Sequence, residues 1–216
     1  ENGVIISDTP VQGYDKTYTQ NMVGVIVPFT FKMWKFGIKK RDLDNVSKEL
    51  KASVARKIEK LCAERLDNGF STSYTHVGQG SSRVITVTGG DGLAAFSNAH
   101  TREDGGSNMN NIIYDGTTYN LPFDYAGLKA AYRTCSLMVD PRGNPRIPSL
   151  NTLVSKKGSA VHYKAMEIKG AIEKNKIPES NDNDGAGAMT FEIVPVEYLT
   201  NAAYWYMFDN SRALTD

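Results

Sequence analysis

Cysteine is scarce in this chain, with two among 216 residues, which is too few for a disulfide framework. Cys62 and Cys135 lie far apart in the sequence, so we interpret both as buried small hydrophobic residues of a protein from a reducing compartment. Long apolar runs are also missing: no stretch approaches the roughly 20 residues that a membrane-spanning helix needs. Nothing at the start resembles a signal peptide. We therefore expect a globular protein that makes no contact with a membrane.

An excess of charge of either sign is lacking as well, because the formal net charge is only +1 at pH 7. Proteins whose main task is coating nucleic acid carry a basic excess that neutralises phosphates, so that class is disfavoured. Near-balance suits protein–protein contact. The 40% hydrophobic content is enough for a core in one large domain or two small ones.

Motifs that hold phosphates or metals are absent. The Gly-rich stretches 78–80 and 89–92 have neither P-loop nor dinucleotide-binding spacing, so we interpret them as turns. The run 182–185 resembles a calcium loop without the bidentate Glu that completes the coordination. The three histidines, His76, His100 and His162, have no partners at metal-ligand spacing. We expect no metal and no cofactor.

One pair of residues could support hydrolysis. Ser97 and His100 lie three positions apart, and a nucleophile with a nearby base is the arrangement of a serine hydrolase. The Gly-x-Ser-x-Gly elbow that activates such a serine is missing. A small serine hydrolase using Ser97 and His100 is therefore kept as an alternative, and we do not expect an enzyme.

The strongest local pattern runs from Arg41 to Gly69. Apolar residues recur there at three-to-five-residue steps and charged residues fill the positions between them, which predicts an amphipathic helix over about 42–68. Such a helix is about 40 Å long, and we expect it to be a spine on which the other elements lean. The apolar positions are Leu43, Val46, Leu50, Val54, Ile58, Leu61 and Leu66.

Shorter patterns divide the remaining chain. Two helices are expected, one opening at Leu121-Pro122-Phe123 and one over about 159–175. Residues 1–36 are rich in β-branched and aromatic residues, which favours a hairpin or two long strands. Further strands are expected at 83–88, 137–139, 152–154, 189–195 and 202–208, with a turn at 140–145.

Several segments together resemble the major capsid proteins of tailed bacteriophages, of the kind with Mu-like major head subunits and the HK97-type fold. Their order and spacing cover most of the chain. They are Lys16-Thr17-Tyr18-Thr19-Gln20, the charged helix ending in 66–72, Asp91 to His100, Met138 to Pro145, the helix from about Ser159, and Tyr198 to Tyr206.

The resemblance implies an α+β fold with a long spine helix, an extended β-hairpin loop, and an axial domain whose central sheet is flanked by helices. In this chain, residues 1–114 would hold the extended loop and the peripheral domain with the spine. Residues 115–216 would form the axial domain, with strands that could return to the peripheral domain. Family members also have an N-terminal arm and a returning C-terminal strand, so this chain is expected to be truncated, processed or divergent.

The function that follows from the resemblance is structural. A capsid protein assembles as hexamers and pentamers into an icosahedral shell around double-stranded DNA, which it contacts non-specifically. Scaffold, portal or cement proteins would be further partners, and the location would be the virion, assembled in the cytoplasm of the bacterial host. A shell protein of a cellular nanocompartment is the first alternative. The subunit-interface candidates are Tyr18, Phe29, Phe31, Arg56, Lys57, Tyr204, Trp205 and Tyr206.

Overall fold

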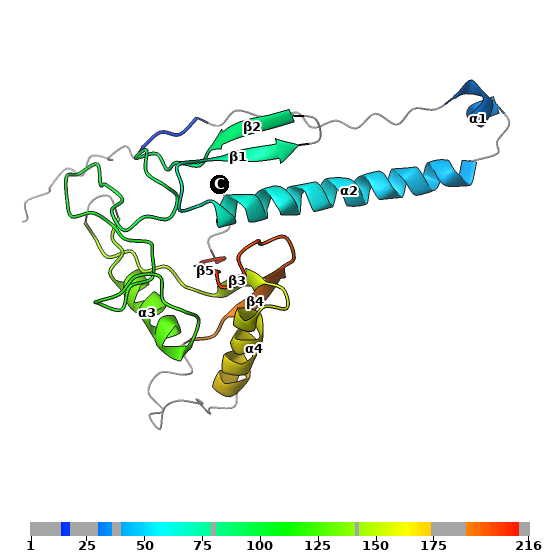
Figure 1. The fold of residues 1–216 in the computed structure, drawn as a ribbon. Helices are drawn as coiled ribbons and strands as arrows, with labels where there is room; N and C mark the ends of the chain where they lie inside the picture. Colours follow the sequence, from blue (N-terminus) through cyan, green and yellow to red (C-terminus); the bar gives the residue numbers. More distant parts are fainter. Residues whose placement is uncertain are drawn as a thin grey trace, which may run out of the picture.

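The structure, a computed structural model, describes residues 14–17, 30–35, 40–78, 81–140, 143–173 and 189–211. Over these ranges the chain forms four helices and five strands. Figure 1 shows a body of loops, short helices and two sheets, from which one long helix projects. The projecting helix is α2 (Lys40–Asp67), and the short helix α1 (Phe31–Lys35) lies beyond its far end.

α2 has 28 residues and closely matches the range that the apolar periodicity predicts. It ends where the side chain and the backbone N–H of Asn68 both donate to the carbonyl of Glu64. Gly69, which follows, does not have a positive φ. Glycine is required there because a Cβ would clash with the ring of Phe96.

The expected role of α2 as a spine is wrong. Leu50, Val54 and Ile58 are 37%, 53% and 57% exposed, so no element among the described residues covers this part of the apolar stripe. Within residues 45–67, where the side chains of α2 are described, only that of Ala63, near the C-terminal end, is fully buried. The helix is attached to the body at one end and projects from it.

Two antiparallel strands follow α2 and lie alongside it in Figure 1. They are β1 (Ser73–Gly78) and β2 (Ser81–Thr86), and they form a separate two-stranded sheet with Tyr74 opposite Ile85. β2 overlaps the strand expected at 83–88. The sequence did not predict β1. Its half-buried face carries Tyr74 and His76 and its exposed face begins with Ser73 and Thr75, so the alternation of apolar and polar residues is weak.

A three-stranded sheet organises the rest of the body, in the order β4-β3-β5. β3 (Thr152–Lys156) is parallel to β4 (Glu192–Val196) and antiparallel to β5 (Trp205–Phe208). These strands overlap the segments expected at 152–154, 189–195 and 202–208. The expected strand at 137–139 is wrong, since Val139 makes only an isolated bridge to Pro145.

Helices α3 (Tyr125–Ser136) and α4 (Ala160–Glu173) pack with this sheet around the main core. Asp124 caps α3, because its carboxylate accepts the backbone N–H of Gly127 at 2.6 Å. Both helices lie close to the ranges that the sequence predicts. Leu128, Leu153 and Ile168 are among the largest fully buried side chains, and Phe123 meets Trp205 edge to face at 4.9 Å.

The HK97-type capsid fold implied by the resemblance is wrong for the part of the chain that the structure describes. The strands there form two small separate sheets, and the long helix projects from the body. The early hairpin falls mostly on residues 1–13 and 18–29, which lie outside the described residues; Tyr14 to Thr17 form no strand and Phe31 is helical. Short segments determine local structure, whereas strand pairing depends on long-range contacts that they do not encode.

Candidate assembly surface

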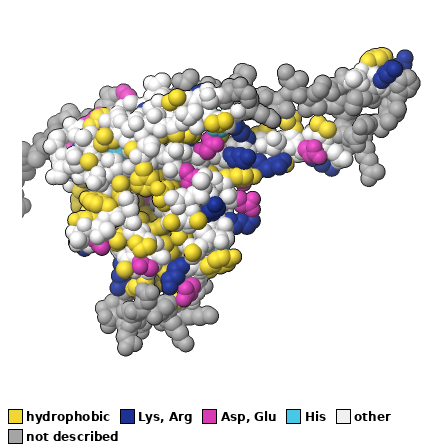
Figure 2. All heavy atoms as spheres, in the orientation of Figure 1, with side chains coloured by type: hydrophobic (Ala, Val, Ile, Leu, Met, Phe, Trp, Pro, Cys, Tyr) yellow, Lys and Arg dark blue, Asp and Glu magenta, His cyan; other side chains and the backbone are white. Residues whose placement is uncertain are grey.

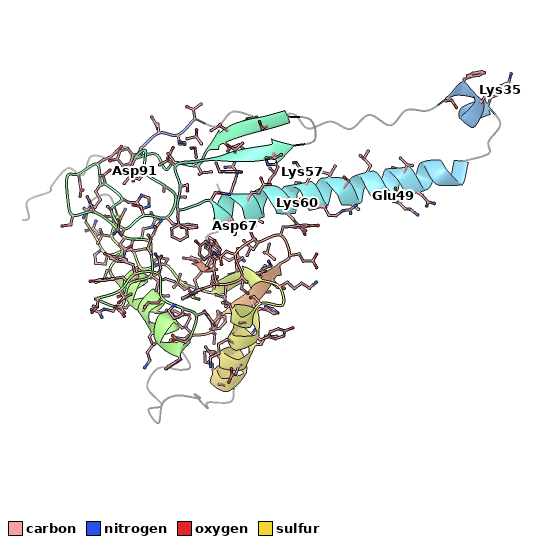
Figure 3. All side chains as sticks on the ribbon, viewed as in Figure 1. Lys35, Glu49, Lys57, Lys60, Asp67 and Asp91 are labelled. Atoms are coloured by element: carbon pink, nitrogen blue, oxygen red, sulfur yellow. The ribbon has the colours of Figure 1, made fainter. Side chains whose placement is uncertain are left out.

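The first feature of the candidate surface is the exposed stripe of α2. Leu50, Val54 and Ile58 follow each other at four-residue steps, so they share one side of the helix. In Figure 3, the part of α2 that carries Glu49 lies well away from the body. Full burial of such a side chain from complete exposure contributes about 1.5–3 kcal/mol, so covering the surface that these three still expose would contribute roughly half of that for each. A lone subunit leaves that free energy unused.

The root of α2 is held by a three-residue network. Nδ1 of His76, on β1, lies 2.5 Å from Oε2 of Glu64, and its Nε2 lies 3.0 Å from Nζ of Lys57. An ammonium group can only donate, so the geometry assigns the ring proton to Nδ1, which donates to Glu64. The network fixes the β1–β2 sheet against the C-terminal half of α2.

The last turn of α2 is also tied to the three-stranded sheet. The hydroxyl of Tyr206 donates to the carbonyl of Leu66 at 3.0 Å, and Asp67 accepts the backbone N–H of Thr200 at 2.7 Å. Burial raises the pKa of Tyr206, so its phenol stays protonated and able to donate. Nζ of Lys60 lies 5.3 Å from the ring centre of Tyr198. One end of α2 is therefore firmly anchored.

The second feature is an apolar groove in the body. A cavity of about 890 Å³ lies between β5, α3 and the loop that precedes α3. Figure 2 shows hydrophobic side chains gathered over this part of the body, below α2. Its residues are mostly aliphatic or aromatic, among them Phe70, Ile113, Phe123, Met138, Val161 and Phe208.

Four aromatic rings connect the groove to the root of α2. Phe70 lies 5.2 Å from Phe96 and 5.6 Å from Tyr204, while Phe96 stacks on Tyr206 at 5.4 Å between ring centres. Such pairs stabilise beyond their buried area by about 0.5–1.5 kcal/mol each. Phe70 and Tyr204 keep 41% and 37% of their surface exposed, so this cluster can contact a partner.

The two cysteines differ in environment, and one differs from our expectation. Cys135 is buried beside the groove, and burial raises the pKa of its thiol to about 11, with the charge of Asp209 adding to the effect. It is therefore a protonated, unreactive thiol at neutral pH. Cys62 is exposed on α2, so the interpretation of it as buried is wrong.

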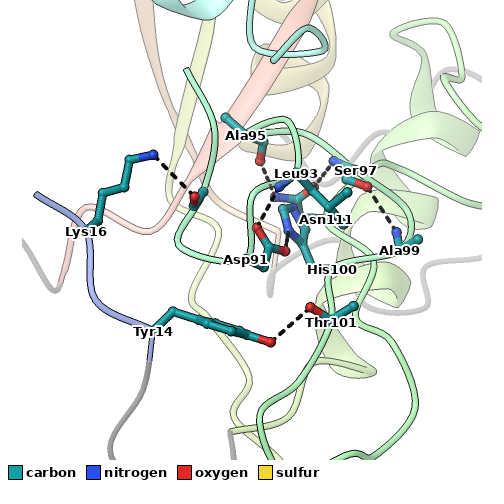
Figure 4. Close-up of polar contacts among 11 residues, drawn as sticks. Tyr14, Lys16, Asp91, Leu93, Ala95, Ser97, Ala99, His100, Thr101 and Asn111 are labelled. Carbon is teal, nitrogen blue, oxygen red and sulfur yellow. Dashed lines mark hydrogen bonds and ion pairs between the residues drawn. The ribbon is translucent and has the colours of Figure 1, made fainter. Parts of the chain in front are cut away.

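The hydrolase candidates lie in the loops shown in Figure 4. Nδ1 of His100 is 2.7 Å from Oδ2 of Asp91, but its buried Nε2 has no hydrogen-bond partner among the described residues. The hydroxyl of Ser97 accepts the backbone N–H of Ala99 at 3.2 Å. Asp91 and His100 thus form a pair, and the nucleophile-to-base hydrogen bond is not made.

This pair belongs to a network that holds the loops together. Burial alone would raise the pKa of Asp91, but hydrogen bonds from His100 and from the backbone of Leu93 lower it below the usual value. Tyr14 reaches the same loops through its hydroxyl, 3.0 Å from Oγ1 of Thr101, and Lys16 donates to Oγ1 of Thr88 at 2.6 Å. Asp91 and His100 therefore have a structural role, which is to hold these loops together.

The predicted interface residues are scattered. Tyr18 and Phe29 lie outside the described residues, and Phe31, on α1, is 67% exposed. Arg56 is exposed and donates to the carbonyl of Ala52, whereas Lys57 is half-buried against His76. Tyr204, which precedes β5, is exposed, while Trp205 and Tyr206, on opposite faces of β5, are both buried within the subunit.

Sequence reasoning missed two parts of the surface. Leu50, Val54 and Ile58 were expected to face the body, because a periodic stripe indicates burial without indicating what buries it. The groove is built from segments between Phe70 and Asp209, and no local pattern reports such a meeting.

Two searches over the described residues bear on location and metals. No helix found there is long and apolar enough to cross a membrane. Over the same ranges, no three His, Cys, Asp or Glu side chains gather as they would around a metal ion.

Comparison with protein-family models, with curated proteins and with solved structures finds no match to this chain.

Proposed function

We propose that this protein is a structural subunit that assembles with copies of itself into a closed shell, as the major head protein of a tailed bacteriophage. The observation that carries the proposal is the apolar surface that one subunit leaves exposed. It comprises the stripe Leu50, Val54 and Ile58 on a projecting helix and the groove in the body. Surfaces of this kind mark protein–protein contact sites.

The shape of the subunit suits such an assembly. α2 is about 42 Å long and is anchored at one end through contacts of Tyr206, Asp67 and His76. The rest of the helix carries the apolar stripe away from the body. A helix that is unsupported by tertiary packing is marginal in water. Contact with a neighbouring copy would stabilise α2 and bury its stripe at the same time.

Double-stranded DNA is the proposed content of the shell. Between Asn45 and Asp67 the helix carries six basic and four acidic residues, and the basic ones can meet phosphates without reading sequence. Because the net charge of the chain is only +1, we expect its contact with the phosphates to be weak, which suits a shell that encloses DNA. Nucleic acid that co-purifies with the assembly would support this content, and a co-purifying enzyme would indicate a nanocompartment instead.

Electron microscopy and light scattering of the purified protein test the proposal. We expect rings, capsomers or shells under at least one salt condition, and a monomer under every condition contradicts it. Val54→Asp should weaken assembly about tenfold or more, because it places a charge in the stripe. Ala52→Asp is the matched control, since two residues along a helix lie 200° apart and Ala52 is also exposed.

A further inference from the structure

The groove is apolar, open and of the size that protein pockets use for a ligand. Its volume of about 890 Å³ is near the top of the range for such pockets, about 300–1,000 Å³. Two exposed apolar residues adjoin the lining residues in the sequence. Leu137 and Ile147, the neighbours of the lining residues Met138 and Pro148, are 71% and 60% exposed. An apolar area of this extent calls for a partner that covers it.

The same subunit carries an apolar projection on another face. Tyr163 and Met166, on α4, are 61% and 44% exposed. Val161 and Lys164 of α4 line the groove. Because Tyr163 is 200° around the helix from Val161, and Met166 is 200° from Lys164, the projection points away from the groove.

The projection is accessible. Gly170 lies two turns beyond Tyr163 on nearly the same side of α4, and a Cβ built on it would meet no atom within 4 Å. The side chain of Tyr163 contacts the ring of His162 at 5.9 Å and is otherwise mostly open to solvent. A neighbouring molecule could therefore approach this face without displacing any of the residues that the structure describes.

We infer that Tyr163 and Met166 of one copy dock into the groove of a second copy, an inference that rests on the self-assembly proposed above. Projection and groove are different surfaces on different faces, so the contact is head-to-tail. Contacts of this type close into rings when the rotation between neighbours permits. The second copy is favoured over other occupants because the chain itself supplies the missing apolar residues.

The lining of the groove carries one cation and one anion, Lys164 and Asp209. Beyond the lining, the backbone N–H of the exposed Arg146 donates to the carbonyl of the lining residue Met138, and Glu167 is exposed one turn beyond Tyr163. Glu167 already meets Lys164 at 3.4 Å, but an exposed pair of this kind contributes little in water. The carboxylate of Glu167 can therefore turn to Arg146 of the second copy, which would help to orient the contact.

Two variants and a mixture of them test the inference. The projection variant is Tyr163→Asp with Met166→Asp, and the groove variant is Leu137→Asp with Ile147→Asp. All four side chains are exposed in the subunit, so each variant should fold, which circular dichroism and urea unfolding will check. The control is Ala126→Asp, an exposed position on α3 outside both surfaces.

Each variant alone should associate at least tenfold more weakly than the wild-type protein in light scattering, while the control should assemble normally. The mixture is decisive, because the groove variant keeps its projection and the projection variant keeps its groove. One intact contact of this kind then remains between the two. When both also carry Val54→Asp, so that the stripe of α2 makes no contact, we expect a one-to-one dimer that grows no further.

The outcomes separate this contact from the proposed function. If the mixture forms no dimer while the wild-type protein still assembles, the contact is wrong and the shell proposal stands. A wild-type protein that stays monomeric contradicts both. The dye anilinonaphthalene sulfonate should bind the groove of the projection variant and be excluded from the assembled wild-type protein; equal binding to the two overturns the contact.

Discussion

The hydroxyl of Tyr206, on β5, donates a hydrogen bond to the carbonyl of Leu66 in the last turn of α2, across 140 positions of sequence. Tyr206 is only 6% exposed, and its ring stacks on that of Phe96. The body therefore holds the projecting helix through a buried polar contact as well as through aromatic packing.

Replacing Tyr206 by Phe should cost about 1 kcal/mol of the free energy of unfolding. The cost should not exceed this value, because the carbonyl of Leu66 also accepts the backbone N–H of Gly69 and keeps that hydrogen bond in the variant. Urea unfolding measures the change. Tyr204→Phe is the control and should be neutral, and equal losses in both variants would contradict the assigned contact.

Replacing His76 by Ala should loosen the β1–β2 sheet from α2. The change removes the acceptor for Lys57 and the donor for Glu64, and bonds to charged groups are worth about 1.5–3 kcal/mol. Hydrogen exchange of the β1 amides should accelerate. Thr75→Ala alters the exposed face of the same strand and should leave the exchange unchanged; similar acceleration there would indicate fraying unrelated to the network.

Replacing Leu128 by Ala should destabilise the subunit by about 2–5 kcal/mol, because its side chain is fully buried between α3 and the sheet. The same change at Leu137, which is 71% exposed, should fall within about 0.5 kcal/mol. Thermal or urea unfolding of the unassembled protein compares the two. A large loss at Leu137 would mean that the rim of the groove is already covered within the subunit.

Acid should weaken the loops around Asp91. The pKa of Asp91 is lower in the folded protein than in the unfolded chain, so its contribution to stability is fully present above the unfolded value of about 4. That contribution is lost as the pH falls through the folded pKa. Asp91→Asn should therefore lower the melting temperature at pH 7, and the gap to the wild-type protein should shrink below about pH 4. A gap that stays constant down to pH 2 would contradict the lowered pKa.

Replacing Ser97 by Ala should leave ester hydrolysis at the background rate. The hydroxyl of Ser97 is engaged with the backbone of Ala99, and Nε2 of His100 has no partner in the part of the chain that the structure describes. A broad panel of chromogenic esters measures the rate. Hydrolysis by the wild-type protein that disappears in the Ser97→Ala variant would favour the hydrolase alternative.

Local patterns predicted three of the four helices, α2, α3 and α4, because each carries its own signal, whereas α1 falls in a segment expected to be extended. The apolar stripe placed α2 within a few residues. Tyr163 and Met166 show where this reasoning ends. They share the periodicity of α4, but the sheet covers only one side of that helix, and the sequence does not say how wide that side is.

The arrangement of the elements could not be predicted in the same way. Trp205 and Tyr206 lie on opposite faces of β5 and pack into two different clusters, and the sequence does not reveal that both faces of this strand are covered. The pairing of β3 with β4 in parallel and β5 in antiparallel joins segments about 40 and 50 residues apart. The groove depends on that pairing, so it emerged only from the structure.

The anchoring of α2 at one end makes it a lever. About 40 Å separates its root from its far end, so a rotation of 5° at the root would carry the far end through about 3–4 Å. Neighbours held at that end could then sit at different angles while the body keeps its own contacts. A single kind of subunit could thereby build surfaces of more than one curvature.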